Sequence, residues 1–180
     1  ERCVIDAVAA WSRAIRRLPE LRFVNGYHDD PAYIDAIAAS MRDHLAKLGF
    51  EPDALIMSFH GMPEKYAEQG DPYPGHCQQT ARLVRERLGW LEARWHMTYQ
   101  SQFGSDPWLQ PYTIDTVGRL ARSGVKRLAM VAPGFSTDCL ETLEELDMEN
   151  RRAFLDNGGE NFAYIPCLNS SPAGMRAIQR

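Results

Sequence analysis

The chain has 180 residues, of which 44% are apolar and 24% are charged, and its formal net charge is −4. A chain of this length and composition can bury a full hydrophobic core without disulfide bonds. The acidic balance argues against a general nucleic-acid surface, and no apolar run approaches the roughly 20 residues of a membrane-spanning helix.

The first half of the chain contains two predicted helices and two predicted strands. Apolar residues recur at helical spacing over residues 3–17, and residues 21–24 are predicted to form a short strand. Asp30 and Pro31 carry the N-cap and first-turn signals of a helix that is expected to end at Gly49. Ala54–Phe59 is an almost continuous apolar run, which is typical of a strand buried on both faces of a parallel sheet.

The same alternation continues to the C-terminus. We predict helices over 74–88, 111–122 and 138–156, strands over 94–100, 126–133 and 162–166, and a short helix after Pro172. Strands that alternate with helices predict an α/β protein, a three-layer doubly wound fold with a mostly parallel sheet.

The functional site is expected at the carboxyl ends of the strands, where open parallel sheets bind ligands. The loops over 61–73 and 101–110 are longer than usual for such a fold. His60 precedes the first of them. A neutral imidazole accepts protons near pH 7 and binds metals such as Fe(II), although this side chain could instead hydrogen-bond its own loop.

Three carboxylates form a second candidate feature, because Glu141, Glu145 and Glu149 recur every four residues. Like charges at this spacing repel, and a row of oxygen ligands could conduct a cation or protons. Two structural alternatives stay open: a capping box between Asp138 and Glu141, and a solvated acidic face opposite the helix leucines. A π-bulge would rotate the carboxylates and remove the second alternative.

The long loops also carry apolar and aromatic side chains suited to a flat apolar ligand. Trp108, flanked by two prolines, is the strongest candidate for ligand contact, with local packing as the alternative. The set comprises Met62, Tyr66, Tyr73, Phe103, Trp108 and Phe135.

Four stretches, in this order, resemble the ferrochelatases, which insert Fe(II) into protoporphyrin IX to form protohaem. They are "SFHGMPEKYAEQGDPYP", "YQSQFGSDPWLQPYT", "PGFSTDCLETLEELD" and "YIPCLN". The resemblance is strongest to the proteobacterial type and covers about the C-terminal half of the family's length. It implies that residues 1–180 are a C-terminal chelatase domain, similar to flavodoxin-like folds, and that the N-terminal chelatase domain is a partner absent from this chain.

The resemblance also implies a role for each matching residue. His60 and Glu141 correspond to catalytic residues, and both are expected to contact the metal together with Glu145 and Glu149. Porphyrin contacts are expected at Met62, Gln100, Ser101, Trp108 and Phe135. Cys139 stands where the animal enzymes have a histidine, which puts a metal role at that position in doubt.

The expected substrates are protoporphyrin IX and Fe(II), with no resident cofactor. A [2Fe–2S] cluster is not expected, because the chain has no C-terminal cysteine extension. Scattered cysteines favour the cytoplasm, and the apolar substrate leaves room for peripheral contact with the inner membrane.

Three alternatives stay open: a related chelatase acting on coproporphyrin III or a cobalt-corrin precursor, a non-catalytic tetrapyrrole-binding half-domain, and a flavodoxin-like domain whose loops serve assembly.

Overall fold

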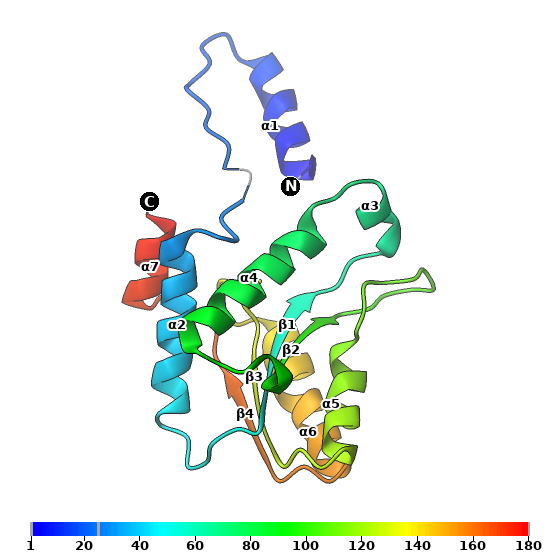
Figure 1. The fold of residues 1–180 in the computed structure, drawn as a ribbon. Coiled ribbons are helices and arrows are strands. Elements are labelled where there is room, and N and C mark those ends of the chain that lie inside the picture. Colours follow the sequence, from blue (N-terminus) through cyan, green and yellow to red (C-terminus); the bar gives the residue numbers. More distant parts are fainter. Residues whose placement is uncertain (1, 25, 180) are drawn as a thin grey trace.

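The computed structural model describes residues 2–24 and 26–179, without the side chains of residues 2 and 3. Its strands are β1 (Ala54–His60), β2 (Trp95–Gln100), β3 (Arg127–Val131) and β4 (Asn161–Ile165) (Figure 1). Its helices are α1 (Arg2–Ala14), α2 (Pro31–Leu45), α3 (Glu64–Glu68), α4 (Tyr73–Leu88), η1 (Glu92–Arg94), α5 (Thr113–Arg122), η2 (Glu141–Glu149), α6 (Asn150–Asp156) and α7 (Pro172–Ile178).

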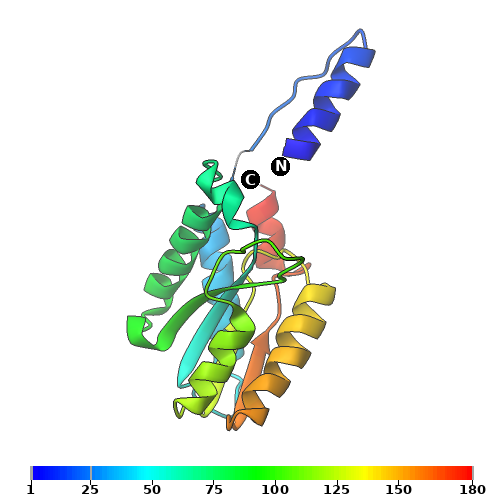
Figure 2. The ribbon, with the colours of Figure 1, turned by 90° about the vertical axis from the view of Figure 1, so that its right-hand side faces the viewer.

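The strands form one sheet in the order β2-β1-β3-β4, and every pair is parallel. Helices cover both faces of this sheet: α2 and α4 lie on one side, and α5 with η2 and α6 on the other (Figure 2). The predicted doubly wound α/β fold is therefore confirmed. The connection from β1 to β2 crosses one face of the sheet through α4, and the connection from β3 to β4 crosses the other face through η2 and α6. The carboxyl ends of β1 and β3 therefore flank the switch point, where such folds bind ligands.

The alternation of side chains along β1 divides the core in two. Leu55, Met57 and Phe59 pack against α2 and α4, whereas Ala54 and Ile56 pack against α5 and α6. This is why the strand reads as a continuous apolar run, since both of its faces are buried.

Helix α2 begins as the sequence indicates but ends earlier than expected. The Asp30 carboxylate accepts hydrogen bonds from the backbone N–H groups of Ala32 (2.8 Å) and Tyr33 (3.3 Å), and Pro31 occupies the first turn. The helix ends at Leu45, with Ala46 as its C-cap, so the predicted end at Gly49 is wrong. Residues 46–50 form a turn and a bend without regular helix.

The predicted strand over residues 21–24 is wrong. Within the described part of the chain, this segment is extended without strand partners, and Phe23 and Val24 are exposed. It joins α1 to the sheet domain, and α1 itself stands away from that domain in both views (Figures 1 and 2). An extended segment becomes a strand only by hydrogen-bonding a neighbouring strand, which is a property of its surroundings.

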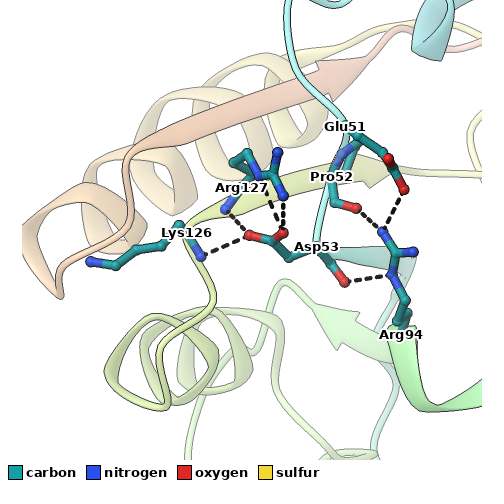
Figure 3. A network of polar contacts seen from close by, with 6 residues as sticks. All are labelled: Glu51, Pro52, Asp53, Arg94, Lys126 and Arg127. Carbon is teal, nitrogen blue, oxygen red and sulfur yellow. Dashed lines mark hydrogen bonds and ion pairs between the residues drawn. The ribbon is translucent and has the colours of Figure 1, made fainter.

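At the amino ends of the strands, Asp53 connects β1 to β3 (Figure 3). Its carboxylate accepts hydrogen bonds from the backbone N–H groups of Lys126 (3.1 Å) and Arg127 (2.9 Å) and from the Arg127 guanidinium. The Arg94 guanidinium donates to the carbonyls of Pro52 and Asp53 and reaches Glu51. This network lies at the edge opposite the carboxyl ends of the strands.

Candidate functional site at the carboxyl edge of the sheet

His60 is the last residue of β1 and lies beside Gln100, the last residue of β2, in the strand register. Its Nδ1 atom is 2.7 Å from the carbonyl oxygen of Gly61. A carbonyl only accepts, so Nδ1 carries the proton, and in the neutral imidazole Nε2 holds a free lone pair. The bond to the loop therefore does not compete with a base function, because it orients the ring and selects its basic nitrogen.

Two aromatic residues lie next to His60. The Tyr73 hydroxyl, from the start of α4, donates to the backbone carbonyl of His60 at 2.8 Å. The Phe135 ring, which follows β3, lies 6.2 Å from the His60 ring between centroids. Phe135 thus lies beside the imidazole, and its contact with a porphyrin stays a prediction.

Glu141 begins η2 and is half-buried near the same edge. The pKa of its carboxyl lies below the usual range, first because the Cys139 side chain hydrogen-bonds it and second because the Glu141 backbone N–H does so. Burial is the main reason why the pKa of the Cys139 thiol is raised, and its bond to Glu141 is the second reason. The thiol therefore keeps its proton and donates it to the bond. Glu141 lies at the same sheet edge as His60, because Gln100, the neighbour of His60 in β2, contacts the Glu141 backbone.

Gln100 and Ser101 contact η2 instead of pointing into solvent. The Gln100 amide nitrogen donates to the backbone carbonyl of Glu141 at 3.1 Å. The Ser101 backbone N–H and hydroxyl both donate to the Glu145 carboxylate, at 2.6 and 2.5 Å. Ser101 has φ = 63°, a strained left-handed value for a residue other than glycine, and this conformation aims both donors at one carboxylate.

The acidic helix is wound as a π-helix over its whole first part, Glu141–Glu149, where the sequence suggests at most a bulge. The wider turn buries Thr142 and Leu146 and leaves Leu140 and Leu143 70% and 49% exposed. An ideal α-helix would bury those two leucines. Glu141 and Glu145 are half-buried beside the sheet edge, whereas Glu149 is exposed.

The alternative of a capping box is wrong. The Asp138 carboxylate accepts hydrogen bonds from the Asn169 amide (2.7 Å) and the Tyr164 hydroxyl (2.9 Å), and in the described residues no side chain caps η2. Burial would raise the pKa of Asp138, but these bonds and the Cys167 backbone N–H outweigh it, so the pKa lies below its usual range. Glu141 is thus free of the structural role that its spacing from Asp138 suggests.

The two long loops are joined to each other. Pro63 and Trp108 form an antiparallel bridge, and the Leu109 N–H donates to the Met62 carbonyl at 3.0 Å. The Trp108 indole is 9% exposed and donates to the Phe103 carbonyl at 2.8 Å. Trp108 therefore packs locally, which is the alternative that the sequence left open. Contact of Trp108 and of the half-buried Met62 with a ligand stays a prediction.

Three residues at this edge have roles that were not predicted: Ser58, Tyr73 as a partner of the His60 backbone, and Cys139 as a partner of Glu141. Ser58 had a visible signal, since it is the one hydroxyl inside the apolar run of β1. Among the side chains that the structure describes, no group of three or more histidine, cysteine or acidic residues is arranged to hold a metal. The described cysteines, Cys77, Cys139 and Cys167, are free thiols.

No helix in the described ranges has the length and apolar character needed to cross a bilayer. The structure of SirB from Bacillus subtilis with Fe3+ is similar to this one, with a TM-score of 0.55 over 82% of this chain and 51% of that chain. Its sequence is 13% identical, so this likeness concerns the fold alone.

Curated relatives are far closer in sequence. The ferrochelatase of Rhizobium meliloti (strain 1021) is 57% identical over 91% of this chain, and that of Polaromonas sp. (strain JS666 / ATCC BAA-500) is 51% identical over 97%. These alignments cover 48% and 47% of the two relatives, so the chain spans about half their length. A family model described as Ferrochelatase matches residues 2–180. Together with the histidine and carboxylate at one sheet edge, this match means that the chain belongs to the ferrochelatase family.

Proposed function

We propose that this chain is the C-terminal half of an enzyme that inserts Fe(II) into protoporphyrin IX, forming protohaem. The observation that carries the proposal is the meeting of two groups at one sheet edge: His60, with a free Nε2 lone pair, and Glu141, whose backbone carbonyl is bound by Gln100 beside His60. Family membership supplies the reaction class, and the relatives' names support iron as the metal.

The chemistry follows from what metal insertion requires. A porphyrin must lose two pyrrole protons, and a ring bound in a bent shape exposes nitrogen lone pairs that a flat ring hides. Binding energy from the periphery of the macrocycle can offset this strain. His60 accepts a pyrrole proton at Nε2, and Glu141 holds the metal or passes on a proton.

The remaining predicted residues take graded roles in this proposal. Glu145 and Glu149 extend the carboxylate path outward from Glu141, with Glu145 oriented by Ser101. Phe135 and Met62 line the macrocycle, and Gln100, Ser101 and Trp108 contact it through the atoms that remain exposed. Iron is a substrate in this scheme, and no resident cofactor or iron–sulfur cluster takes part.

The partner that the proposal requires is the N-terminal chelatase domain. The relatives are about twice as long as the part that this chain matches. Support comes from the exposed apolar side chains of α1 and the following segment, among them Val4, Trp11, Leu18, Phe23 and Val24. An apolar surface of this kind is typical of an interface that a further part of the protein covers. We place the enzyme in the cytoplasm, with peripheral contact to the inner membrane through its apolar substrate.

The first test compares the chain alone with the full-length enzyme that contains it. We expect iron and zinc insertion into protoporphyrin IX from the full-length enzyme only, because half a site binds one side of the macrocycle. Parallel assays with coproporphyrin III and with a cobalt-corrin precursor measure substrate preference. Faster turnover of either compound than of protoporphyrin would overturn the proposed substrate.

The second test is His60→Ala in the full-length enzyme. Loss of a general base lowers kcat by about 100-fold or more, while porphyrin binding, measured by fluorescence quenching, is retained. The matched control is His44→Ala at the far end of α2, where the ring bonds to its own helix at Ser40. Normal turnover of the His60 variant would remove this residue from the mechanism.

A further inference from the structure

We propose that Ser58, Thr98 and Thr113 are positioning residues. Their hydroxyls form a one-way series of hydrogen bonds, the hydroxyl chain, which fixes the Gln100 amide and through it the start of η2 at Glu141. The catalytic consequence of this inference rests on the proposed function, whereas the positioning itself does not.

The direction of every bond in the hydroxyl chain follows from its end. The Glu141 carbonyl only accepts, so the Gln100 group facing it at 3.1 Å is the NH2 group. The Gln100 carbonyl oxygen then faces Ser58 Oγ at 2.9 Å, and Ser58 must donate its single proton to it.

The same reasoning continues into α5 and β2. Ser58 Oγ lies 2.8 Å from Thr113 Oγ1, and because the Ser58 proton is used, Thr113 donates. Thr98 Oγ1 lies 2.9 Å from Thr113 Oγ1 and donates in turn, since the Thr113 proton is used as well. The order is Thr98 to Thr113 to Ser58 to Gln100 to the Glu141 carbonyl, and no member can reverse without leaving two acceptors or two donors face to face.

Burial makes this direction matter energetically. Ser58 and Thr98 are 0% exposed, Thr113 is 2% and Gln100 4%, so water cannot replace a lost partner. A buried polar atom that loses its partner costs more free energy than the bond itself contributes. The hydroxyl chain therefore holds the Gln100 amide in one of its two orientations, the one that donates to Glu141.

The geometry of the sheet connects this series to both reacting groups. Ser58 and His60 are two residues apart in β1 and share a face, and their register partners Thr98 and Gln100 lie on the same face of β2. Upstream, this face carries Ala54 and Ile56 in the core against α5 and α6. The polar residues thus replace the apolar core only where η2 begins, and they set the position of Glu141 relative to His60.

The experiment uses full-length enzyme with Ser58→Ala, Thr113→Val and Thr116→Val. Thr116 is the matched control, because it lies on α5 with the same 2% exposure as Thr113 but outside the hydroxyl chain. We measure kcat and KM for protoporphyrin, urea unfolding, and hydrogen–deuterium exchange of peptides that cover residues 141–149.

Ser58→Ala should lower kcat by about tenfold, because it leaves the Gln100 carbonyl without a donor and frees the amide to turn. KM for protoporphyrin should stay within about twofold, and exchange over 141–149 should become faster. Thr113→Val should produce a smaller change of the same kind, about threefold in kcat, and Thr116→Val should match the wild type. Rates are compared between variants that the urea curves show to be fully folded in the assay buffer.

Three results would overturn the inference. Ser58→Ala could leave both kcat and exchange unchanged, or it could raise KM alone, which would show that the hydroxyl chain supports porphyrin binding and not the position of η2. Equal effects of Thr113→Val and Thr116→Val would reduce the hydroxyl chain to general packing. If the wild-type enzyme inserts no metal, the proposed function fails, and the exchange data alone decide whether the hydroxyl chain positions η2.

Discussion

At the scale of single residues, the orientation of His60 depends on its neighbour Gly61. Its ring orientation depends on the Gly61 carbonyl, and the space around Gly61 is minimal. A Cβ atom at this position would lie 2.8 Å from the Gln100 carbonyl oxygen and 3.1 Å from the Trp108 ring. The glycine therefore allows the end of β1, the end of β2 and the second loop to pack together.

We expect Gly61→Ala to destabilise the protein by about 1–3 kcal/mol, because overpacking next to backbone atoms forces the strand ends apart. Urea unfolding gives this value. Gly75→Ala on α4 is the control: a Cβ there meets no atom within 4 Å, and alanine in a helix should stabilise by about 0.5–1 kcal/mol. A Gly61 variant as stable as the wild type would contradict the close packing.

At the scale of the element, π-winding changes what the acidic helix presents. Three side chains four residues apart, Thr142, Leu146 and Asn150, are buried, and each follows one of the three glutamates. Glu141 and Glu145 therefore lie at the boundary between core and solvent, where the sheet edge can bind them. Glu149 is exposed and lies beyond the reach of Gln100 and Ser101, which bind the other two.

This gradient predicts unequal effects of charge removal. Glu141→Gln should lower the rate of metal insertion by about 100-fold, because it removes the charge of the carboxylate that the proposed mechanism pairs with His60. Glu149→Gln should change the rate by less than about threefold, since this side chain is exposed and far from the ring. Steady-state kinetics with zinc and iron compare the two variants, and equal losses would contradict a gradient along η2.

At the scale of the whole molecule, the two edges of the sheet carry different tasks. The carboxyl edge gathers His60, Gln100 and the acidic helix, whereas the amino edge holds the Asp53 network (Figure 3). Hydrogen bonding from the Arg127 side chain is the main reason why the pKa of Asp53 lies below its usual range. A carboxylate with a lowered pKa in the folded state stabilises above its unfolded pKa, about 3.9, and loses this contribution as pH falls.

Asp53→Asn should therefore destabilise the protein by about 2 kcal/mol at pH 7, and the difference from wild type should shrink below about pH 4. Urea unfolding at a series of pH values measures it. Asp43→Asn, on the exposed side of α2, serves as the control and should change stability little. A constant difference across this pH range would show that the Asp53 charge is not what stabilises the strand ends.

Local patterns in the sequence were sufficient to predict much of the fold and the place of His60 at the carboxyl edge of the sheet. Apolar periodicity is set by neighbours in the chain, so it predicted the four parallel strands of the sheet and most helices. The carboxyl ends of all buried parallel strands lie at the same edge of the sheet, which is why His60 could be assigned to the ligand-binding edge. The roles expected of Gln100, Ser101 and Trp108 were less accessible, because buried polar groups and packed rings depend on partners far away in sequence.

What the printed sequence settles here is the local order: which segments are strands or helices, and which side chains follow each strand. The folded structure decides how those segments complete one another. It winds Glu141–Glu149 as a π-helix, joins Gln100 to the Glu141 carbonyl and leaves residues 21–24 without a strand partner. The reason is physical: a hydrogen bond between residues about forty positions apart exists only after the sheet has brought both ends to the same edge.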